Sequence, residues 1–244
     1  MGIEITLEKG RYRAREADKA ADIEAAQALR ARCFGLKTAR DADAFDARSR
    51  HILIEEQESG ALVSCFRLSA LRGEDLEQSY AAQFYELSAL HSYDGLMMEL
   101  GRFCVHPDRS DPDIMRLAWA ALTDFVDRHD VKLLFGCSSF AGVEVAEYLD
   151  AFAILKERHL APKRWLPQVK APDVFRFASR LARAPDRAEA MRRMPPLLKT
   201  YLMMGGWVSD HAVVDRQMNT LHVFTGVEIG AIPDSRKRLL RALV

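Results

Sequence analysis

The sequence predicts a mixed α/β domain, and three observations support this. Apolar strand patterns alternate with amphipathic helical patterns along the first 155 residues. A strand–helix–strand order occupies residues 96–137, which is typical of sheets flanked by helices. Hydrophobic residues make up 49% of the 244-residue chain, which is enough to bury a substantial core. We therefore expect one domain, residues 1–244, with a basic insertion at about 156–199.

The first half of the chain provides five further elements. A short strand is expected at Ile3–Leu7, and the 3.6-residue spacing of apolar side chains predicts a helix over Asp18–Cys33. Two strand patterns, His51–Glu56 and Ala61–Leu68, flank a Ser-Gly turn and predict a hairpin. The segment Tyr80–Leu90 is expected to be helical.

The strand–helix–strand region contains the clearest helix. An apolar strand is predicted at Leu96–Val105, followed by a helix that starts after Asp111, a good N-cap, with Pro112 in its first position. A buried strand at Lys132–Cys137 completes the unit, and its ligands are expected beyond the first strand's carboxyl end.

The C-terminal part contains four predicted elements. Helices are expected at Glu144–Leu155, after Pro195 up to a Gly-Gly pair, and at Asp234–Leu243, with a strand at Thr220–Val227.

Charge is distributed unevenly, although the whole chain has no net charge. Residues 156–199 contain twelve Lys and Arg but only four Asp and Glu. Such a segment suits an acidic protein partner or an anionic membrane surface, or it is simply a solvated face. Nucleic acid is the least favoured partner, because no recognition motif accompanies the charge.

Other sequence features limit the class of protein. No run of 18 apolar residues predicts a membrane-spanning helix, and the N-terminus lacks a secretory pattern. The four cysteines are far apart, which predicts reduced thiols in a cytoplasmic protein. No Cys/His spacing indicates a metal site.

Two charged residues interrupt the apolar strand at 96–105. Glu99 and Arg102 fall on opposite faces of a regular strand, so a single site can use both only if the strand bulges near Gly101. A charge within an apolar strand needs a partner or a function. The alternative is an edge ion pair for Arg102 and a solvated Glu99.

Further candidates lie on either side of that strand. Arg67 is embedded in the hairpin, and Asp43 and Asp46 precede it as a pair that suits a cationic substrate or, alternatively, a solvated loop. Arg109 lies in the loop before the 112–129 helix, whose N-terminus suits a phosphate, although Asp111 competes for the same donors. A Cys or Ser nucleophile is disfavoured, because no GxSxG turn is present.

The order of these motifs resembles a known group of enzymes. The segment ELGRFCVHPD, followed by a helix and LLFGCSSF, resembles the acyl-carrier-protein-dependent N-acyltransferases that make lyso-ornithine lipid. It is also similar to their relatives, the acyl-homoserine-lactone synthases. Earlier segments RARCF, DAFD, HILI and CFRL occur in the order of those families, and PPLLKTYLMMGG and DRQMNTLHVF look like the ornithine branch. The resemblance covers residues 11–230 and implies a GNAT-like acyltransferase fold with a mixed central sheet flanked by helices.

The resemblance also implies roles for individual residues. Glu99 would act as the base on the acceptor amine, and Arg102 would join it at the chemical centre. Val105 and Arg109 would bind phosphopantetheine. The substrate-binding residues implied are Phe34, Asp43, Asp46, Arg67, Phe103, Ser138 and Ser139, the two serines lining an acyl tunnel.

The co-substrate implied is the acyl-phosphopantetheine of acyl carrier protein, with no permanently bound cofactor. The loop HPDRSDPDIM has no glycine, which argues against the pyrophosphate of coenzyme A. The acceptor favoured is ornithine, with glutamine or another amino acid, a lactone synthase and a non-catalytic carrier-protein binder as alternatives. Peripheral contact of this cytoplasmic protein with an anionic inner membrane stays open.

Overall fold

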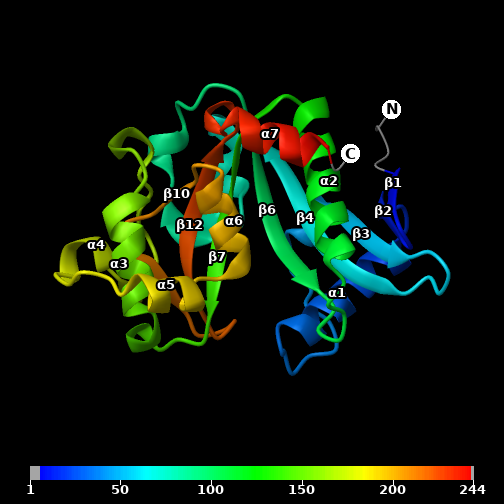
Figure 1. Cartoon of the computed structure of the whole chain (residues 1–244), viewed down its shortest axis with the longest axis horizontal. Helices are drawn as coiled ribbons and strands as arrows, with labels where there is room; N and C mark the ends of the chain where they lie inside the picture. Colours follow the sequence, from blue (N-terminus) through cyan, green and yellow to red (C-terminus); the bar gives the residue numbers. More distant parts are fainter. Residues whose placement is uncertain (1–5, 243–244) are drawn as a thin grey trace. The chain divides into compact units, whose positions relative to one another are not determined.

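The computed structural model describes residues 6–242, and the chain divides into two compact units (Figure 1). The first contains residues 6–70, 100–131 and 234–242, and the second contains residues 71–99 and 132–233. Strand β6 (Leu96–Val105) is shared, because the boundary falls between its fourth and fifth residues.

In the first unit a sheet is covered by helices on both faces. The strands lie in the order β1-β2-β3-β4-β6, and the other strands and helices of this unit are β1 (Thr6–Lys9), β2 (Tyr12–Glu16), β3 (Arg50–Glu56), β4 (Leu62–Leu71), α1 (Ala20–Cys33), α2 (Pro112–Arg128) and α7 (Asp234–Arg241). Leu53 and Cys65 are paired across β3 and β4 and pack with α1. The guanidinium of Arg50, three residues earlier on β3, lies 5.1 Å from the ring of Phe125 on α2.

The second unit is built on long antiparallel strands. β12 pairs with β7 and β11, β11 pairs with β9, and short strands β5 and β8 form a separate ladder. The elements are β5 (Tyr85–Glu86), β7 (Val131–Ala141), β8 (Gln168–Val169), β9 (Val174–Phe175), β10 (Trp207–Val208), β11 (Ala212–Asp215), β12 (Thr220–Glu228), α3 (Leu149–Arg158), α4 (Phe177–Arg180), α5 (Arg187–Arg193) and α6 (Pro196–Met203).

Two hydrophobic clusters in the second unit form on elements that share β12. One contains Phe135, Trp207 and Phe224, and the other contains Phe140, Leu221 and Val223. Since side chains alternate along β12, Phe224 and its neighbour Val223 point to opposite faces.

Most predicted elements are confirmed. Helix α2 begins where the sequence indicates, and the Asp111 side chain accepts a hydrogen bond from the N–H of Asp113. Helix α6 ends before Gly205, whose φ of +86° is left-handed and suits a residue without a side chain. Of the strand expected at Ile3–Leu7, residues 3–5 lie outside the described residues, as does the last residue of Asp234–Leu243.

One prediction is wrong. The segment Tyr80–Leu90 is not a helix but two 3-10 turns, Ala81–Gln83 and Ser88–Leu90, on either side of β5. Tyr85 pairs with Val169 on β8, so a long-range ladder replaces the local helix that the apolar spacing suggested.

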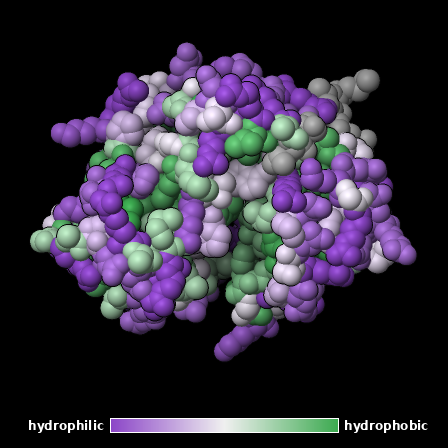
Figure 2. Space-filling model, viewed as in Figure 1, coloured by the Kyte–Doolittle hydropathy of each residue, from purple (hydrophilic) through white to green (hydrophobic). Residues whose placement is uncertain are grey.

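The basic segment 156–199 belongs to the second unit and is not a single helical insertion. It contains the end of α3, strands β8 and β9, helices α4 and α5 and the start of α6. Figure 2 shows hydrophilic side chains over the α4 and α5 region, with hydrophobic ones between them. Within residues 6–242, no helix is both long and apolar enough to cross a membrane.

Candidate active site

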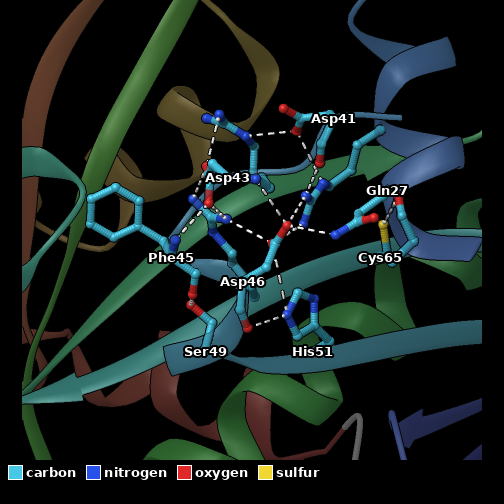
Figure 3. A network of polar contacts seen from close by, with 12 residues as sticks. Gln27, Asp41, Asp43, Phe45, Asp46, Ser49, His51 and Cys65 are labelled. Atoms are coloured by element: carbon cyan, nitrogen blue, oxygen red, sulfur yellow. Dashed lines mark hydrogen bonds and ion pairs between the residues drawn. The ribbon is translucent and has the colours of Figure 1, made fainter. Parts of the chain in front are cut away.

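Three arginines and three aspartates form a buried network in the first unit (Figure 3). Their positive and negative charges balance, which offsets much of the cost of removing them from water. The six residues come from α1, the loop before β3, β4 and β6, and they are Arg30, Asp41, Asp43, Asp46, Arg67 and Arg102.

Arg30 and Asp46 form the most deeply buried part of the network. Arg30 is 1% exposed, and its two terminal nitrogens donate to both oxygens of Asp46 at 2.8 and 2.9 Å. Burial opposes the charge on Arg30, but the hydrogen bonds and charges of Asp46 and the charge of Asp41 outweigh it and raise the pKa of Arg30. Burial likewise opposes the Asp46 charge, yet Arg30 holds the pKa of this carboxyl well below its usual range.

His51 lies beneath Asp46. Its Nε2 is 3.0 Å from the Asp46 carbonyl oxygen, and the ring is 3% exposed. Burial lowers the pKa of His51, so the ring is neutral near pH 7 and adds no fourth positive charge to the network.

Arg67 and Asp43 form the part of the network that includes its most exposed carboxylate. The two terminal nitrogens of Arg67 donate to both oxygens of Asp43, at 2.7 and 2.9 Å, and one also reaches Asp46 at 2.9 Å. Burial opposes the charge on Asp43, but hydrogen bonding to Arg67 lowers its pKa overall. The Asp43 side chain is 22% exposed against 8% for Asp46, so Asp43 is the more accessible carboxylate of the predicted pair.

Arg102 completes the network and has an unusual backbone. Its Nε donates to Asp41 at 2.8 Å and its Nη2 to Asp43 at 3.3 Å. Its φ of +54° is left-handed, a conformation that costs a non-glycine residue about 1–2 kcal/mol. The sequence placed a backbone irregularity near Gly101, and the structure has it one residue later, at Arg102.

Glu99 belongs to the second unit and has different partners. Its two carboxylate oxygens each accept a backbone hydrogen bond at 2.8 Å, one from Tyr80 and one from Ala81. The side chain is 5% exposed. The alternative of a solvated Glu99 is therefore wrong. Arg102 does form an ion pair, as its alternative expected, but with Asp41 and Asp43 inside the network, where its side chain is 11% exposed.

Sequence reasoning did not assign Arg30 or Asp41 to the site. Arg30 follows Ala26 by four residues, so it lies on the buried face of α1, and a charged residue on such a face is a usable signal. Asp41 gave no signal, because its partners Arg30 and Arg102 are 11 and 61 residues away.

The two predicted aromatic residues pack in the first unit. Phe34 follows α1, donates its backbone N–H to the Arg30 carbonyl at 2.9 Å and packs with the apolar cluster beneath that helix. Phe103 stacks on Phe66, with ring centroids 5.3 Å apart. Neither contact tests a role in binding substrate, which stays a prediction.

The two predicted serines do not share a surface. Ser138 is buried and accepts a hydrogen bond from the Thr225 hydroxyl at 2.9 Å, whereas its neighbour Ser139 is exposed and lies opposite His222. Successive residues of β7 point to opposite faces. Both serines could line one tunnel only if it passes between the strands, so their role in holding the acyl chain stays a prediction.

The predicted phosphopantetheine residues lie near the start of α2. Arg109 is 3.6 Å from Glu56, and the Val105 carbonyl accepts from the Cys33 thiol at 3.3 Å. The Asp111 carboxylate caps α2 and also accepts from Arg11 and Tyr12, at 3.3 and 3.2 Å. A carboxylate therefore occupies the helix N-terminus that would otherwise attract a pyrophosphate.

Known proteins match this chain in both sequence and fold. The family model described as an acetyltransferase (GNAT) domain matches residues 24–120. An L-ornithine N(alpha)-acyltransferase of Rhodobacter capsulatus is 33% identical over 204 residues, covering 81% of this chain and 78% of the relative. The chain belongs to the L-ornithine N(alpha)-acyltransferase family.

Other matches in this family and fold agree. The Brucella abortus L-ornithine N(alpha)-acyltransferase is 32% identical and covers 88% of this chain and 83% of its own length. An N-acyl amino acid synthase from uncultured soil microbes has a TM-score of 0.53 at 9% identity, covering 91% of this chain and 94% of its own. This likeness shows the fold alone. The GNAT family model and the ornithine N-acyltransferase relatives show that the chain is an acyltransferase.

Proposed function

We propose that this enzyme transfers a 3-hydroxy fatty acyl group from acyl carrier protein to the α-amine of L-ornithine, giving lyso-ornithine lipid. Ornithine as acceptor is carried by one observation: relatives named L-ornithine N(alpha)-acyltransferase match over more than 80% of this chain. The carrier-protein donor and the 3-hydroxyl are the further parts of the proposal.

The acceptor must lose a proton before it attacks. An ammonium has no free electron pair, so a base removes one proton, and the amine nitrogen then forms a bond to the thioester carbonyl carbon. Collapse of the tetrahedral intermediate breaks the carbon–sulfur bond, and the thiolate leaves and takes up a proton. Glu99 is the proposed base, acting directly or through a water, because its buried carboxylate is oriented by Tyr80 and Ala81.

The arginine–aspartate network supplies recognition of a cationic acceptor. Asp43 is its most exposed aspartate, and Arg67 and Arg102 fix its carboxylate. A backbone N–H within Phe103–Val105 is the proposed donor to the oxyanion. Ornithine carries two amines, so the Asp43 carboxylate can bind the side-chain amine while the α-amine reacts.

The start of α2 supports a carrier-protein donor over coenzyme A. The Asp111 carboxylate repels the two phosphates of a pyrophosphate, whereas a carrier-protein arm brings a single phosphate attached to the protein itself. The exposed arginines of α4 and α5, Arg180 and Arg187 among them, offer positive charge to an acidic partner.

An acceptor screen tests the reaction. Purified enzyme with 3-hydroxyacyl carrier protein is incubated with ornithine, lysine, glutamine or S-adenosylmethionine, and free thiol and product mass are measured. We expect thiol release with ornithine and a lyso-ornithine lipid product. A lactone product, or no thiol release with any acceptor, contradicts the proposal. Replacing the carrier protein by the matching coenzyme A thioester is expected to lower kcat/KM at least about tenfold.

The variant Glu99→Gln tests the base. It keeps an oxygen for one backbone donor but removes the proton acceptor, so kcat should fall by about 10²–10⁴. The matched control is Glu86→Gln, an acidic residue of the same unit whose carboxylate accepts hydrogen bonds from the N–H and the hydroxyl of nearby Ser88. Near-normal turnover of Glu99→Gln from pH 6 to 9 would show that Glu99 is not the general base.

Reversing charge on α4 and α5 tests the docking role. The double variant Arg180→Glu/Arg187→Glu should raise KM for acyl carrier protein about tenfold with kcat little changed, because steering acts on association. Arg116→Glu on α2, another exposed arginine, is the control. If only binding to anionic vesicles falls, the segment serves a membrane, and if neither changes, it is a solvated face.

A further inference from the structure

The second unit holds a buried polar group inside an otherwise apolar cluster. Tyr85 is 0% exposed and His222 is 2% exposed, and the Tyr85 hydroxyl lies 2.8 Å from the His222 carbonyl oxygen and 3.0 Å from its Nδ1. Tyr85 belongs to the cluster that contains Trp207 and Phe224. Since the partners are 137 residues apart, the pair is a product of the fold.

The hydrogen-bond arithmetic fixes the tautomer of His222. A tyrosine hydroxyl has one proton, and a carbonyl oxygen can only accept, so Tyr85 donates to the His222 carbonyl. Both contacts are satisfied at once only if Nδ1 carries the ring proton and donates to the Tyr85 oxygen. Burial lowers the pKa of His222 to about 4, so the ring is neutral near pH 7 and Nε2 is left as a lone-pair acceptor.

That acceptor is buried and has no hydrogen-bond partner among the described residues. A buried polar atom without a partner destabilises the folded protein, and native proteins contain few of them. A ligand that donates a hydrogen bond removes this cost. A hydroxyl group fits, because its O–H can donate to Nε2 while its carbon chain lies among apolar side chains.

A chain of contacts links His222 to the residue that holds the Glu99 carboxylate. Its ring meets Phe84 edge-on at 4.8 Å, Phe84 contacts Tyr80 at 5.4 Å, and the Tyr80 N–H holds Glu99. On the paired strand β7, Ser139 lies opposite His222 and is exposed. The exposed Ser139 brings this face of β7 to solvent one strand away from His222, whose own Nε2 is enclosed by its neighbours.

We propose that His222 Nε2 accepts a hydrogen bond from the 3-hydroxyl of the acyl chain. His222, oriented by Tyr85, is then the residue that selects 3-hydroxyacyl donors over plain acyl donors. The inference rests on the proposed function, because it needs an acyl-transfer reaction in which to act. A hydroxyl two carbons from the reacting carbonyl is the part of the donor that a plain fatty acyl group lacks. A site built to bond a hydroxyl discriminates against an analogue without one much better than an apolar pocket does.

The test measures a ratio. For each protein, kcat/KM is determined with 3-hydroxyhexadecanoyl and hexadecanoyl carrier protein and with ornithine as acceptor. The wild type should prefer the hydroxylated donor at least about tenfold. His222→Phe keeps a ring against Phe84 and should bring the ratio near one by slowing the hydroxylated donor alone. Because both donors are measured on one preparation, a loss of folded protein cancels from the ratio.

His211→Phe is the matched control. His211 is also fully buried, lies in the same unit and has an Nε2 without a partner, while its Nδ1 is 2.6 Å from Asp210. The ratio of kcat/KM for the two donors should stay at the wild-type value in His211→Phe. A ratio lost in His211→Phe but kept in His222→Phe overturns the assignment.

The remaining outcomes separate the two proposals. If the wild type uses both donors equally, a water satisfies Nε2 and the inference fails while the proposed function stands. If the wild type releases no thiol from either donor, the proposed function fails. Should His222→Phe not fold, NMR of ring-¹⁵N-labelled wild type is the second measurement: adding 3-hydroxyacyl pantetheine should shift Nε2, and the plain thioester should not. No difference between the two thioesters overturns the inference.

Discussion

Two groups of buried polar side chains, one in each unit of the chain, are organised in different ways. The group in the first unit is charged and balanced: three arginines face three aspartates, and Asp46 contacts both Arg30 and Arg67. In the second unit the Tyr85–His222 pair is neutral, and one of its acceptors has no partner. A balanced network fixes the geometry of its own members, whereas an incomplete one indicates what a ligand would supply.

The difference predicts which substitutions damage the fold and which change selection of a ligand. Removing a member of the charged network leaves a buried charge without its partner, which is among the most costly single changes in a protein. Removing a neutral hydroxyl or ring costs less, because no ion remains. Three measurements examine this, from the largest expected effect to the smallest.

Arg30→Met should lower the free energy of unfolding by about 3–5 kcal/mol, because Asp46 keeps its charge in a buried position. Urea unfolding followed by circular dichroism measures it. Arg32→Met is the matched control on the same helix: Arg32 and its partner Asp108 are 55% and 69% exposed, and such pairs contribute about 0–1 kcal/mol. Equal losses for the two variants would show that burial of the network does not matter.

Acid should weaken the second unit in a defined range of pH. The pKa of His222 is lowered to about 4 by burial, from about 6.5 in an unfolded chain. Between these two pH values the ring is therefore protonated in the unfolded state and neutral in the folded state. Stability is complete above pH 6.5 and falls by about 3 kcal/mol as pH drops to 4. The charge of Asp215 acts against the shift and His211 acts with it.

Urea unfolding at pH 7.5, 6, 5 and 4.5 measures that loss, and His222→Phe should flatten the curve over this range. In the first unit, Asp46 has a lowered pKa, so its contribution persists down to the ordinary aspartate range near pH 4 and is lost only below it. An unchanged slope in His222→Phe would assign the loss to other groups.

Tyr85→Phe should cost about 2 kcal/mol, because it leaves the His222 Nδ1 and carbonyl oxygen without their shared partner. Tyr93→Phe, whose hydroxyl reaches the Lys132 carbonyl at 3.3 Å near the surface, should change stability by less than about 1 kcal/mol. Thermal unfolding of both variants decides it, and a Tyr85→Phe variant as stable as the wild type would mean that water replaces the hydroxyl.

The sequence alone determined the elements whose signals lie close together in the chain. The Asp111 cap and the apolar spacing behind it define α2, and the turn at Gly60 defines the β3–β4 hairpin. These features depend on neighbours within one or two helical turns, or across a short turn, so a local pattern is enough. The order of short motifs also indicated the acyltransferase family before any coordinates.

Only the tertiary structure decided how the polar groups meet. It joined Arg102 to Asp41 over 61 residues and Tyr85 to His222 over 137, and it made Tyr85 part of a strand where the local spacing predicted a helix. The reason is physical: a buried charge or ring nitrogen is satisfied by whatever the fold places beside it. The sequence shows that such a group needs a partner but not which residue that partner is.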